Sequence, residues 1–294
     1  MKFSKVEVLK SKEDKTVNFV FRGDFPGYME ARYVRRSPDY LIVYLSSQTG
    51  CQQACRMCHL TITGQTKLVD VDKWGYISQA QEVLDYYKNN EPKAKIVHFS
   101  FMVRGEPLAN QFLTDPANYE ILHMLSSYAF GAGLHPRFCI STIMPTLVRD
   151  KKLIDMFPVL YPDFYYSLYS INENFRKKWL NHALPVDEAL AKLVEWQSIT
   201  KKIPKIHWSY IKGENDTTAD AYEIAKKINE SGLKVDINIV RYNPYSEKYG
   251  EESSIEVIQK NVSILRHQLP DNTKIKSIPR VGHDVKGSCG MFIE

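Results

Sequence analysis

The sequence predicts an α/β fold in which strands and helices alternate to build a parallel sheet. Six segments of strand length alternate with amphipathic stretches, and β–α units in series form parallel sheets with right-handed crossovers. The chain has 294 residues, 44% of them hydrophobic, so it can bury a sizeable core. Two earlier strands predict a small N-terminal sheet. The candidate strands span 17–22, 29–34, 41–46, 95–102, 137–142, 163–169, 205–211 and 235–240.

Three of the intervening stretches carry apolar residues at helical spacing. Gly232 is expected as the left-handed residue after the second of these helices, where a side chain would be strained. Ser253 and Glu256 are expected to form a capping box at the start of the third. The helical faces lie within 186–194, 221–228 and 255–269.

This alternation fits both a doubly wound sheet and a full or partial α/β barrel. In either fold, ligands bind at the C-terminal ends of the strands. Residues that carry chemistry follow the candidate strands: Cys51 the first of the six, Gly105 and Glu106 the second, and Asn243 the sixth, while Ser141 closes the third. We therefore expect these residues to share one end of the sheet.

Composition limits the classes of partner. The net charge is +5, which permits a polyanionic partner without demanding one. No run of residues approaches the length of a membrane span, and the N-terminus has no apolar core of a secretory signal. The sequence therefore predicts a cytoplasmic protein with no membrane partner.

Five cysteines are present, and three of them, Cys51, Cys55 and Cys58, lie within eight residues. Such crowding in a chain without a secretory signal favours metal binding or catalysis over disulfides. The spacing Cys-x3-Cys-x2-Cys allows three thiolates to bind three irons of one cubane [4Fe–4S] cluster. The fourth iron could then chelate a small molecule, a geometry that suits reductive cleavage of S-adenosyl-L-methionine. The alternative is a zinc site with His59 as a cramped fourth ligand, but a second pair of cysteine ligands is missing.

Several motifs in order resemble those of the radical-SAM RNA adenine methyltransferases, which methylate C2 of rRNA and tRNA adenine or C8 in ribosomal antibiotic resistance. The resemblance runs from about Glu30 to the C-terminus. SSQTGC-x3-C-x2-C resembles the family's SSQ-x-GC-x3-C-x2-C, FMVRGEPLAN (101–110) its FMGMGEPLLN, and VGHDVKGSCG (281–290) its RGDDIDAACG. Shorter matches occur at 141–142, 166–168, 215–216 and 242–244.

The resemblance implies a six-stranded partial α/β barrel at 39–294 with a C-terminal catalytic loop. It also implies a small β extension at 1–38, without the family's accessory RNA-binding domain. The [4Fe–4S] cluster and S-adenosyl-L-methionine are the implied cofactors, and an electron donor such as flavodoxin or ferredoxin is an implied partner. Gly105 and Glu106 would bind the amino group of S-adenosyl-L-methionine, and Ser141, Ser167 and Asn243 the rest of that molecule. Read alone, Glu106 could merely cap a helix and Asn243 could lie in an ordinary turn.

Cys289 and Glu30 are the implied catalytic residues. In the family, the cysteine matching Cys289 is methylated, and a carbon radical on its methyl group then adds to the adenine ring. Tethering the radical removes the entropy cost of bringing the partners together. Glu30 resembles the family's proposed proton acceptor. The alternatives are a free buried cysteine and an ordinary strand glutamate.

The sequence departs from the family at two informative positions, Tyr44 and Arg104. Tyr44 occupies the place of the second catalytic cysteine, which resolves the protein–RNA adduct in the family. Cys139 shares a predicted strand face with Ser141 and could replace that cysteine, although a small core cysteine is the simpler interpretation. Arg104 replaces a methionine of the FMGMGEP motif.

Three hypotheses follow. The first is a radical-SAM enzyme that methylates C2 or C8 of adenine in rRNA or tRNA. The second is a radical-SAM enzyme with another substrate or outcome, motivated by Tyr44. The third is a non-catalytic iron–sulfur RNA-binding protein.

Overall fold

The computed structural model describes Met1 and residues 3–294. Ten strands form one sheet in which each strand pairs with its neighbours in chain order. The strands are β1 (Phe3–Lys10), β2 (Val17–Gly23), β3 (Met29–Val34), β4 (Tyr40–Leu45), β5 (Ile96–Phe101), β6 (His135–Thr142), β7 (Asp163–Ser167), β8 (Lys205–Trp208), β9 (Asp236–Val240) and β10 (Ile275–Ile278).

The sheet has an antiparallel and a parallel part that join at β4. Strands β1 to β4 pair antiparallel, and every pair from β4 to β10 is parallel. The predicted α/β class is therefore confirmed. The predicted number of six parallel strands is corrected to seven, because β10 pairs parallel to β9 from Ile275 to Ile278.

The two strands that sequence reasoning missed, β1 and β10, lie at the edges of the sheet. Both are half-exposed, and lysines interrupt their apolar residues. An edge strand packs on one side only, so its sequence lacks the strong apolar signal of a central strand. The eight predicted strands all form, with ends that differ by a few residues.

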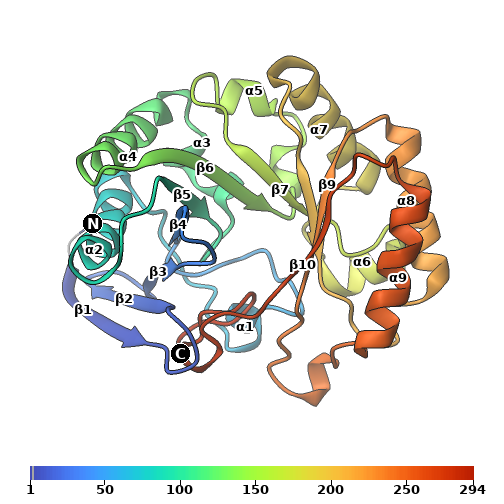
Figure 1. Ribbon diagram of the computed structural model, residues 1–294, viewed down its shortest axis with the longest axis horizontal. Helices are drawn as coiled ribbons and strands as arrows, with labels where there is room; N and C mark the ends of the chain where they lie inside the picture. Colours follow the sequence, from blue (N-terminus) through green and yellow to red (C-terminus); the bar gives the residue numbers. More distant parts are fainter. Residues whose placement is uncertain (2) are drawn as a thin grey trace.

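Helices cover the outer face of the curved sheet, and Figure 1 shows the longer ones arranged around its rim. The same view shows the C-terminal segment returning across the inner side, near α1. The helices are α1 (His59–Ile62), α2 (Lys73–Asn90), α3 (Gln111–Thr114), α4 (Tyr119–Gly131), α5 (Leu153–Met156), α6 (Glu173–Trp179), α7 (Val186–Thr200), α8 (Thr218–Ser231) and α9 (Ile255–Gln268), with 3₁₀ turns at η1 (Pro107–Ala109), η2 (Pro116–Asn118), η3 (Thr146–Val148), η4 (Glu247–Tyr249) and η5 (His283–Val285).

The observed ends of α8 and α9 can be compared with the predicted cap residues. Gly232 ends α8 in the left-handed conformation, with φ of 71°, as expected. The predicted capping box at Ser253 is wrong by one residue: Ser254 caps α9, and the Ser253 hydroxyl instead donates to Asp216 at 2.7 Å. A capping box does occur in the structure, at Thr217 of α8.

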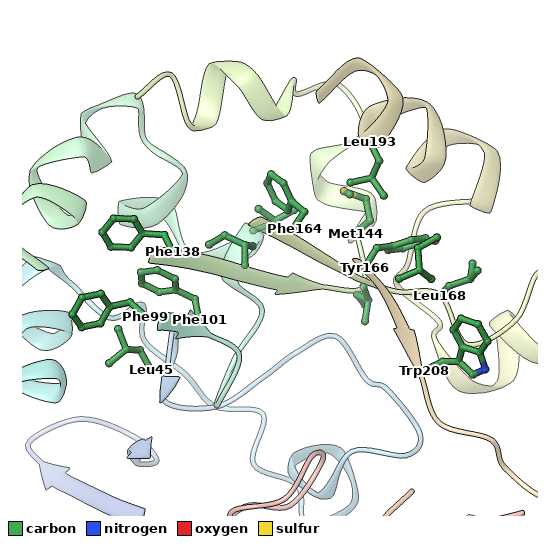
Figure 2. Close-up of a cluster of buried hydrophobic side chains, with 14 of the residues drawn as sticks. Leu45, Phe99, Phe101, Phe138, Met144, Phe164, Tyr166, Leu168, Leu193 and Trp208 are labelled. Carbon is green, nitrogen blue, oxygen red and sulfur yellow. The ribbon is translucent and has the colours of Figure 1, made fainter. Parts of the chain in front are cut away.

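The core lies between the sheet and the helices, and alternation along each strand decides which side chains enter it. Figure 2 shows Phe164 and Tyr166 of β7 in this apolar cluster, where Phe164 also meets the Trp196 ring edge-on at 5.0 Å. Tyr165 and Ser167 alternate with them and therefore face the inner side of the sheet. This inner side is where polar residues of several strands meet. Across Met1 and 3–294, no helix combines the length and apolarity needed to cross a membrane.

Candidate active site

A loop after β4 carries Cys51, Cys55 and Cys58, all partly buried. Cys51 N donates to the Gln65 carbonyl at 3.1 Å, and within the loop Cys58 N donates to the Cys55 carbonyl at 3.0 Å. A side chain at Gly50 would collide with the Lys67 and Gln65 carbonyls, so glycine is required there. Local sequence therefore fixes the path of the cysteine loop.

The three thiols form a donor set suited to iron. Burial raises the pKa of Cys51 to about 12 and that of Cys58 to about 11, and for Cys51 the neighbouring Cys58 adds to the shift. Burial also raises the pKa of Cys55, with Cys51 and Cys58 contributing. The thiols are thus close enough to influence one another, and metal cations would displace their protons. These residues fit a [4Fe–4S] cluster on chemical grounds.

His59 does not act as a fourth ligand of the alternative zinc site. Its ring Nε2 lies 3.2 Å from the Asn243 carbonyl, and the ring meets Tyr245 edge-on at 5.1 Å. Within the described residues, no group of three or more His, Cys, Asp or Glu side chains is arranged to hold one metal ion. In a cubane each cysteine binds a different iron, so its thiols need not converge on one ion.

Gly105 and Glu106 follow β5 and lie beside the cysteine loop. A Cβ at Gly105, whose φ is 91°, would lie 2.6 Å from the Gln48 side chain. The Glu106 carboxylate accepts from Leu108 N at 3.1 Å and from Ile143 N at 3.2 Å. It therefore does cap the 3₁₀ turn η1. Burial raises the pKa of Glu106 to about 7, so the carboxyl is poised to change charge near neutral pH.

Ser141 and Ser167 converge on a histidine that sequence reasoning missed. His207 Nε2 lies 2.8 Å from Ser167 Oγ and 3.3 Å from Ser141 Oγ. Burial lowers the pKa of His207 to about 4, so the ring is neutral at pH 7. The signal in the sequence was its position in a strand between the core residues Ile206 and Trp208, which directs the histidine to the opposite face.

Asn243, after β9, joins several segments of the site. Its Nδ2 donates to the Cys289 carbonyl at 2.9 Å, and its Oδ1 accepts from Arg280 Nε at 2.8 Å. Its own carbonyl is the partner of His59, the first residue of α1, directly after the cysteine loop. Asn243 therefore connects the cysteine loop to the segment that carries Cys289.

Cys289 opens onto a cavity of about 140 Å³ on the inner side of the sheet. The residue is exposed to solvent, although its surroundings desolvate the thiol and raise its pKa, with Arg32 and Arg36 acting in the opposite direction. The cavity collects residues of many strands, among them Tyr44, Ser141, Tyr165, His207, Asn243, Arg32, Arg36, Arg241 and Arg280. Its chemistry combines a thiol, hydroxyls, a neutral imidazole and cationic side chains.

Tyr44, at the sequence position that matches the second cysteine of the resembling family, lines this cavity. Burial raises the pKa of Tyr44, and the neighbouring Cys289 and Cys139 add to the shift while Arg36 opposes it. Cys139 is 2% exposed on β6. The phenol therefore lies near both thiols without being a thiol itself.

Glu30, on β3, is fully buried and bound at both carboxylate oxygens. Oε1 accepts from Arg104 Nε at 2.7 Å and from Ile293 N at 3.1 Å. Oε2 accepts from Asn18 Nδ2 at 2.8 Å and from Arg32 Nη2 at 3.0 Å. Burial alone would raise the pKa of Glu30, but Arg32, Arg104 and Asn18 outweigh it and hold the pKa below its usual value. The carboxylate is thus charged and held within the protein.

Comparisons with known proteins agree with the motifs. The chain is 27% identical to the dual-specificity RNA methyltransferase RlmN of Vesicomyosocius okutanii, over 99% of this chain and 78% of that protein. It is 26% identical to the ribosomal RNA large subunit methyltransferase Cfr of Staphylococcus aureus, over 97% of this chain and 74% of that protein. No protein-family model matches the chain.

Among solved structures, a radical SAM methyltransferase from Sphaerobacter thermophilus has the same fold, with a TM-score of 0.78 and 19% identity. The match covers 98% of this chain and 80% of the other. The two relatives confirm the resemblance to the radical-SAM RNA adenine methyltransferases and the expected enzyme class, and the solved structure confirms the fold. The [4Fe–4S] cluster and S-adenosyl-L-methionine predicted from the sequence are the cofactors of that class.

Proposed function

We propose that this chain methylates a ring carbon, C2 or C8, of adenine in an RNA, with Cys289 as the methyl carrier. The observation that carries the proposal is the junction of Cys289 with the cysteine loop. His59 N donates to the Gly290 carbonyl at 3.0 Å, and Asn243 binds both segments. The thiol of Cys289 and the three cluster cysteines therefore serve one site.

The roles of the remaining residues follow from their positions. Cys51, Cys55 and Cys58 would hold the cluster, which with S-adenosyl-L-methionine supplies radical chemistry when bound. Glu106, as a carboxylate, would bind the ammonium group of S-adenosyl-L-methionine. Gly105, Ser141, Ser167 and Asn243 are proposed to contact the same molecule.

Glu30 stays a predicted proton acceptor. Its four hydrogen-bond donors and its lowered pKa favour a structural carboxylate, because a base must release such partners before taking a proton. The position of Glu30 on β3, next to the C-terminal segment, keeps it within the same site.

RNA is the proposed substrate because relatives over nearly the whole chain are named RNA methyltransferases. The arginines of the cavity support this proposal, since guanidinium groups bind phosphate. A flavodoxin or ferredoxin remains the predicted electron donor. The curvature of the parallel strands supports the partial barrel at 39–294, with 1–38 as its β extension.

The test uses anaerobically reconstituted protein, dithionite, labelled S-adenosyl-L-methionine and total RNA. We expect both 5′-deoxyadenosine and methylated adenine, detected by mass spectrometry of the digested RNA. Cys289→Ala should abolish methylation while the cluster is retained, and Cys139→Ala should leave methylation within about threefold, because a buried core cysteine needs only similar volume. Normal RNA methylation by Cys289→Ala would overturn the carrier role.

A radical-SAM reaction with another outcome is the second candidate, and Tyr44 favours it. The phenol occupies the cavity beside Cys289, and it cannot break a carbon–sulfur adduct by forming a disulfide. This candidate predicts 5′-deoxyadenosine without methylated adenine in the wild type. Methylated adenine that appears only with Tyr44→Cys would support it, whereas methylation by the wild type would exclude it.

A further inference from the structure

A network of buried charged side chains connects β3 and the segment after the cysteine loop with the C-terminal segment. Arg104 follows β5, and its side chain is fully buried. Its Nε donates to Glu30 at 2.7 Å, its Nη1 to Gln65 Oε1 at 2.7 Å, and its Nη2 to the Ile293 carbonyl. One guanidinium thus contacts β3, the segment after the cysteine loop and the C-terminal segment.

Arg32 extends the network to the residues flanking Cys289. Its Nη1 donates to the Gly287 carbonyl at 3.0 Å, and its Nη2 donates to the Met291 carbonyl at 2.7 Å. Glu30 completes the connection by accepting from Ile293 N at 3.1 Å. Arg32 therefore contacts the backbone on both sides of Cys289, while Glu30 and Arg104 hold Ile293 on the C-terminal side.

The buried network keeps an excess of positive charge. Two guanidinium groups share one carboxylate, and the excess positive charge is met by backbone carbonyls, Gln65 and the Phe292 ring. Buried charges are tolerated when they are paired and hydrogen-bonded, and although Arg32 Nε has no partner among the described residues, removing a further partner would leave an uncompensated charge. The network therefore opposes any displacement of the C-terminal segment.

Arg104 also fixes the loop that carries the cluster cysteines. Its carbonyl accepts from Ser47 N at 2.8 Å and from Gln48 N at 3.1 Å, just before Cys51. Its backbone thus holds the cysteine loop while its side chain holds the end of the chain. The resembling motif has a methionine at this position, and its side chain has no hydrogen-bond donor. A methionine could therefore hold the cysteine loop through its backbone but could not hold the C-terminal segment through its side chain.

We propose that Arg104 is a positioning residue that acts through Glu30 and the Ile293 carbonyl to hold Cys289 in place. Residues 287–293 form the held segment. The proposal rests on the proposed function for what Cys289 does, but the placement of this segment can be measured without any turnover.

The test is amide hydrogen exchange of the cofactor-free protein. In Arg104→Met, exchange within 287–293 should rise by roughly tenfold to a hundredfold, the factor expected when one or two buried charge-assisted hydrogen bonds no longer oppose local opening. The rate of Cys289 alkylation, followed on the peptide that contains Cys289, should rise together with the exchange. Arg104→Lys should restore part of the protection, because its ammonium can reach Glu30 but cannot form the planar fork.

Arg35→Met is the matched control. Arg35 also donates to backbone carbonyls, those of Pro92 and Pro38, yet it contacts no residue of the held segment. Amide exchange within 287–293 in the Arg35→Met protein should equal that of the wild type. Unchanged exchange in Arg104→Met would overturn the positioning role, even if the Cys289→Ala assay supports the proposed function. If Arg104→Met does not fold, Glu30→Gln must raise exchange in the same segment, or the proposal fails.

Discussion

Glu106 is a buried carboxyl whose charge is set by what it contacts. Burial raises its pKa from 4.5 to about 7, because the Thr142 side chain and the backbone N–H groups of Leu108 and Ile143 offset only part of the cost of desolvation. A bound ammonium group would reverse this balance and favour the carboxylate. The same environment thus makes Glu106 receptive to a cation and costly to ionise without one.

This environment predicts a pH dependence of stability. Between pH 4.5 and about 7 the folded protein keeps a proton that the unfolded chain releases, so the free energy of unfolding falls as pH rises through this window. The shift corresponds to about 3 kcal/mol in total. Urea unfolding of the cofactor-free wild type and of Glu106→Gln, from about pH 5 to pH 8, should show the variant gaining that amount relative to the wild type. A difference that is constant with pH would contradict the raised pKa.

His207 makes a second prediction at the scale of single residues. His207→Ala removes the shared partner of Ser141 and Ser167, so affinity for S-adenosyl-L-methionine should fall about tenfold, the effect of one lost hydrogen bond to a positioned group. Iron and sulfide content should not change. Equilibrium dialysis of the reconstituted protein measures the first, and metal analysis the second.

His98→Ala is the matched control. His98 lies on β5 of the same sheet, stacks on Tyr40 at 4.9 Å and also has its pKa lowered by burial to about 4. It does not line the cavity of Cys289. Equal loss of affinity in both variants would mean that the effect is general and that His207 has no special role.

Residues that act locally were predictable, and residues that act across the chain were not. The spacing of Cys51, Cys55 and Cys58 is a local signal, and it predicted a shared loop. Arg104 and Ile293 are 189 residues apart, and nothing near either residue indicates the contact between them. Arg32 lies near Arg35 and Arg36 in the sequence, a pattern typical of a solvated surface, but the structure buries it.

Among the secondary-structure elements, the helix caps show how local hydrogen bonds choose between neighbouring serines. Ser253 and Ser254 could both cap the helix, but the Ser253 hydroxyl donates to Asp216 and Ser254 is the N-cap. The sequence could not decide between them, because Asp216 lies 37 residues away. The central strands, by contrast, were predictable because apolar residues dominate them, as in YLIVYL of β4 and IVHFSF of β5.

Replacing the N-cap residues should lower the free energy of unfolding by amounts that depend on the geometry of each cap. Thr217→Ala should lower the free energy of unfolding by about 1–2 kcal/mol, since it removes a complete capping box. Ser254→Ala should cost less, about 0.5 kcal/mol, because its single bond to Val257 N is long at 3.4 Å. Ser127→Ala, at an exposed position within α4, should cost nothing. Urea titration followed by circular dichroism gives the order, and a larger loss at Ser254 would contradict the observed cap geometry.

At the scale of the whole molecule, the C-terminal segment connects the two edges of the sheet. It leaves β10 and returns to the antiparallel strands, where Gly282 N donates to Asp14 at 2.8 Å and Ser11 Oγ donates to Asp284 at 2.6 Å. The segment therefore covers the inner side of the sheet at the point where Cys289 faces the cavity. A curved sheet without this segment would leave the cysteine loop more open to solvent.

Phe292 is the apolar contact through which this segment covers the cysteine loop. Its side chain is 5% exposed and packs with Leu60 and Val103, and Cys51 and Cys58 pack against the same small cluster. Phe292→Ala should lower the free energy of unfolding by about 3 kcal/mol and open a path for solvent to the two thiols. In the cofactor-free protein, alkylation of Cys51 and Cys58 should then accelerate, and in the reconstituted protein the cluster absorbance should decay faster in air.

Phe292→Leu and Phe130→Ala separate shielding from a general loss of stability. Leucine keeps most of the buried volume, so Phe292→Leu should retain slow alkylation. Phe130 is 58% exposed on α4, and its removal should change neither rate. If Phe292→Ala were less stable but its thiols reacted no faster than those of the wild type, the C-terminal segment would stabilise the fold without shielding the cysteine loop. Faster alkylation without a change in global stability would show instead that the end of the chain controls solvent access to residues near its beginning.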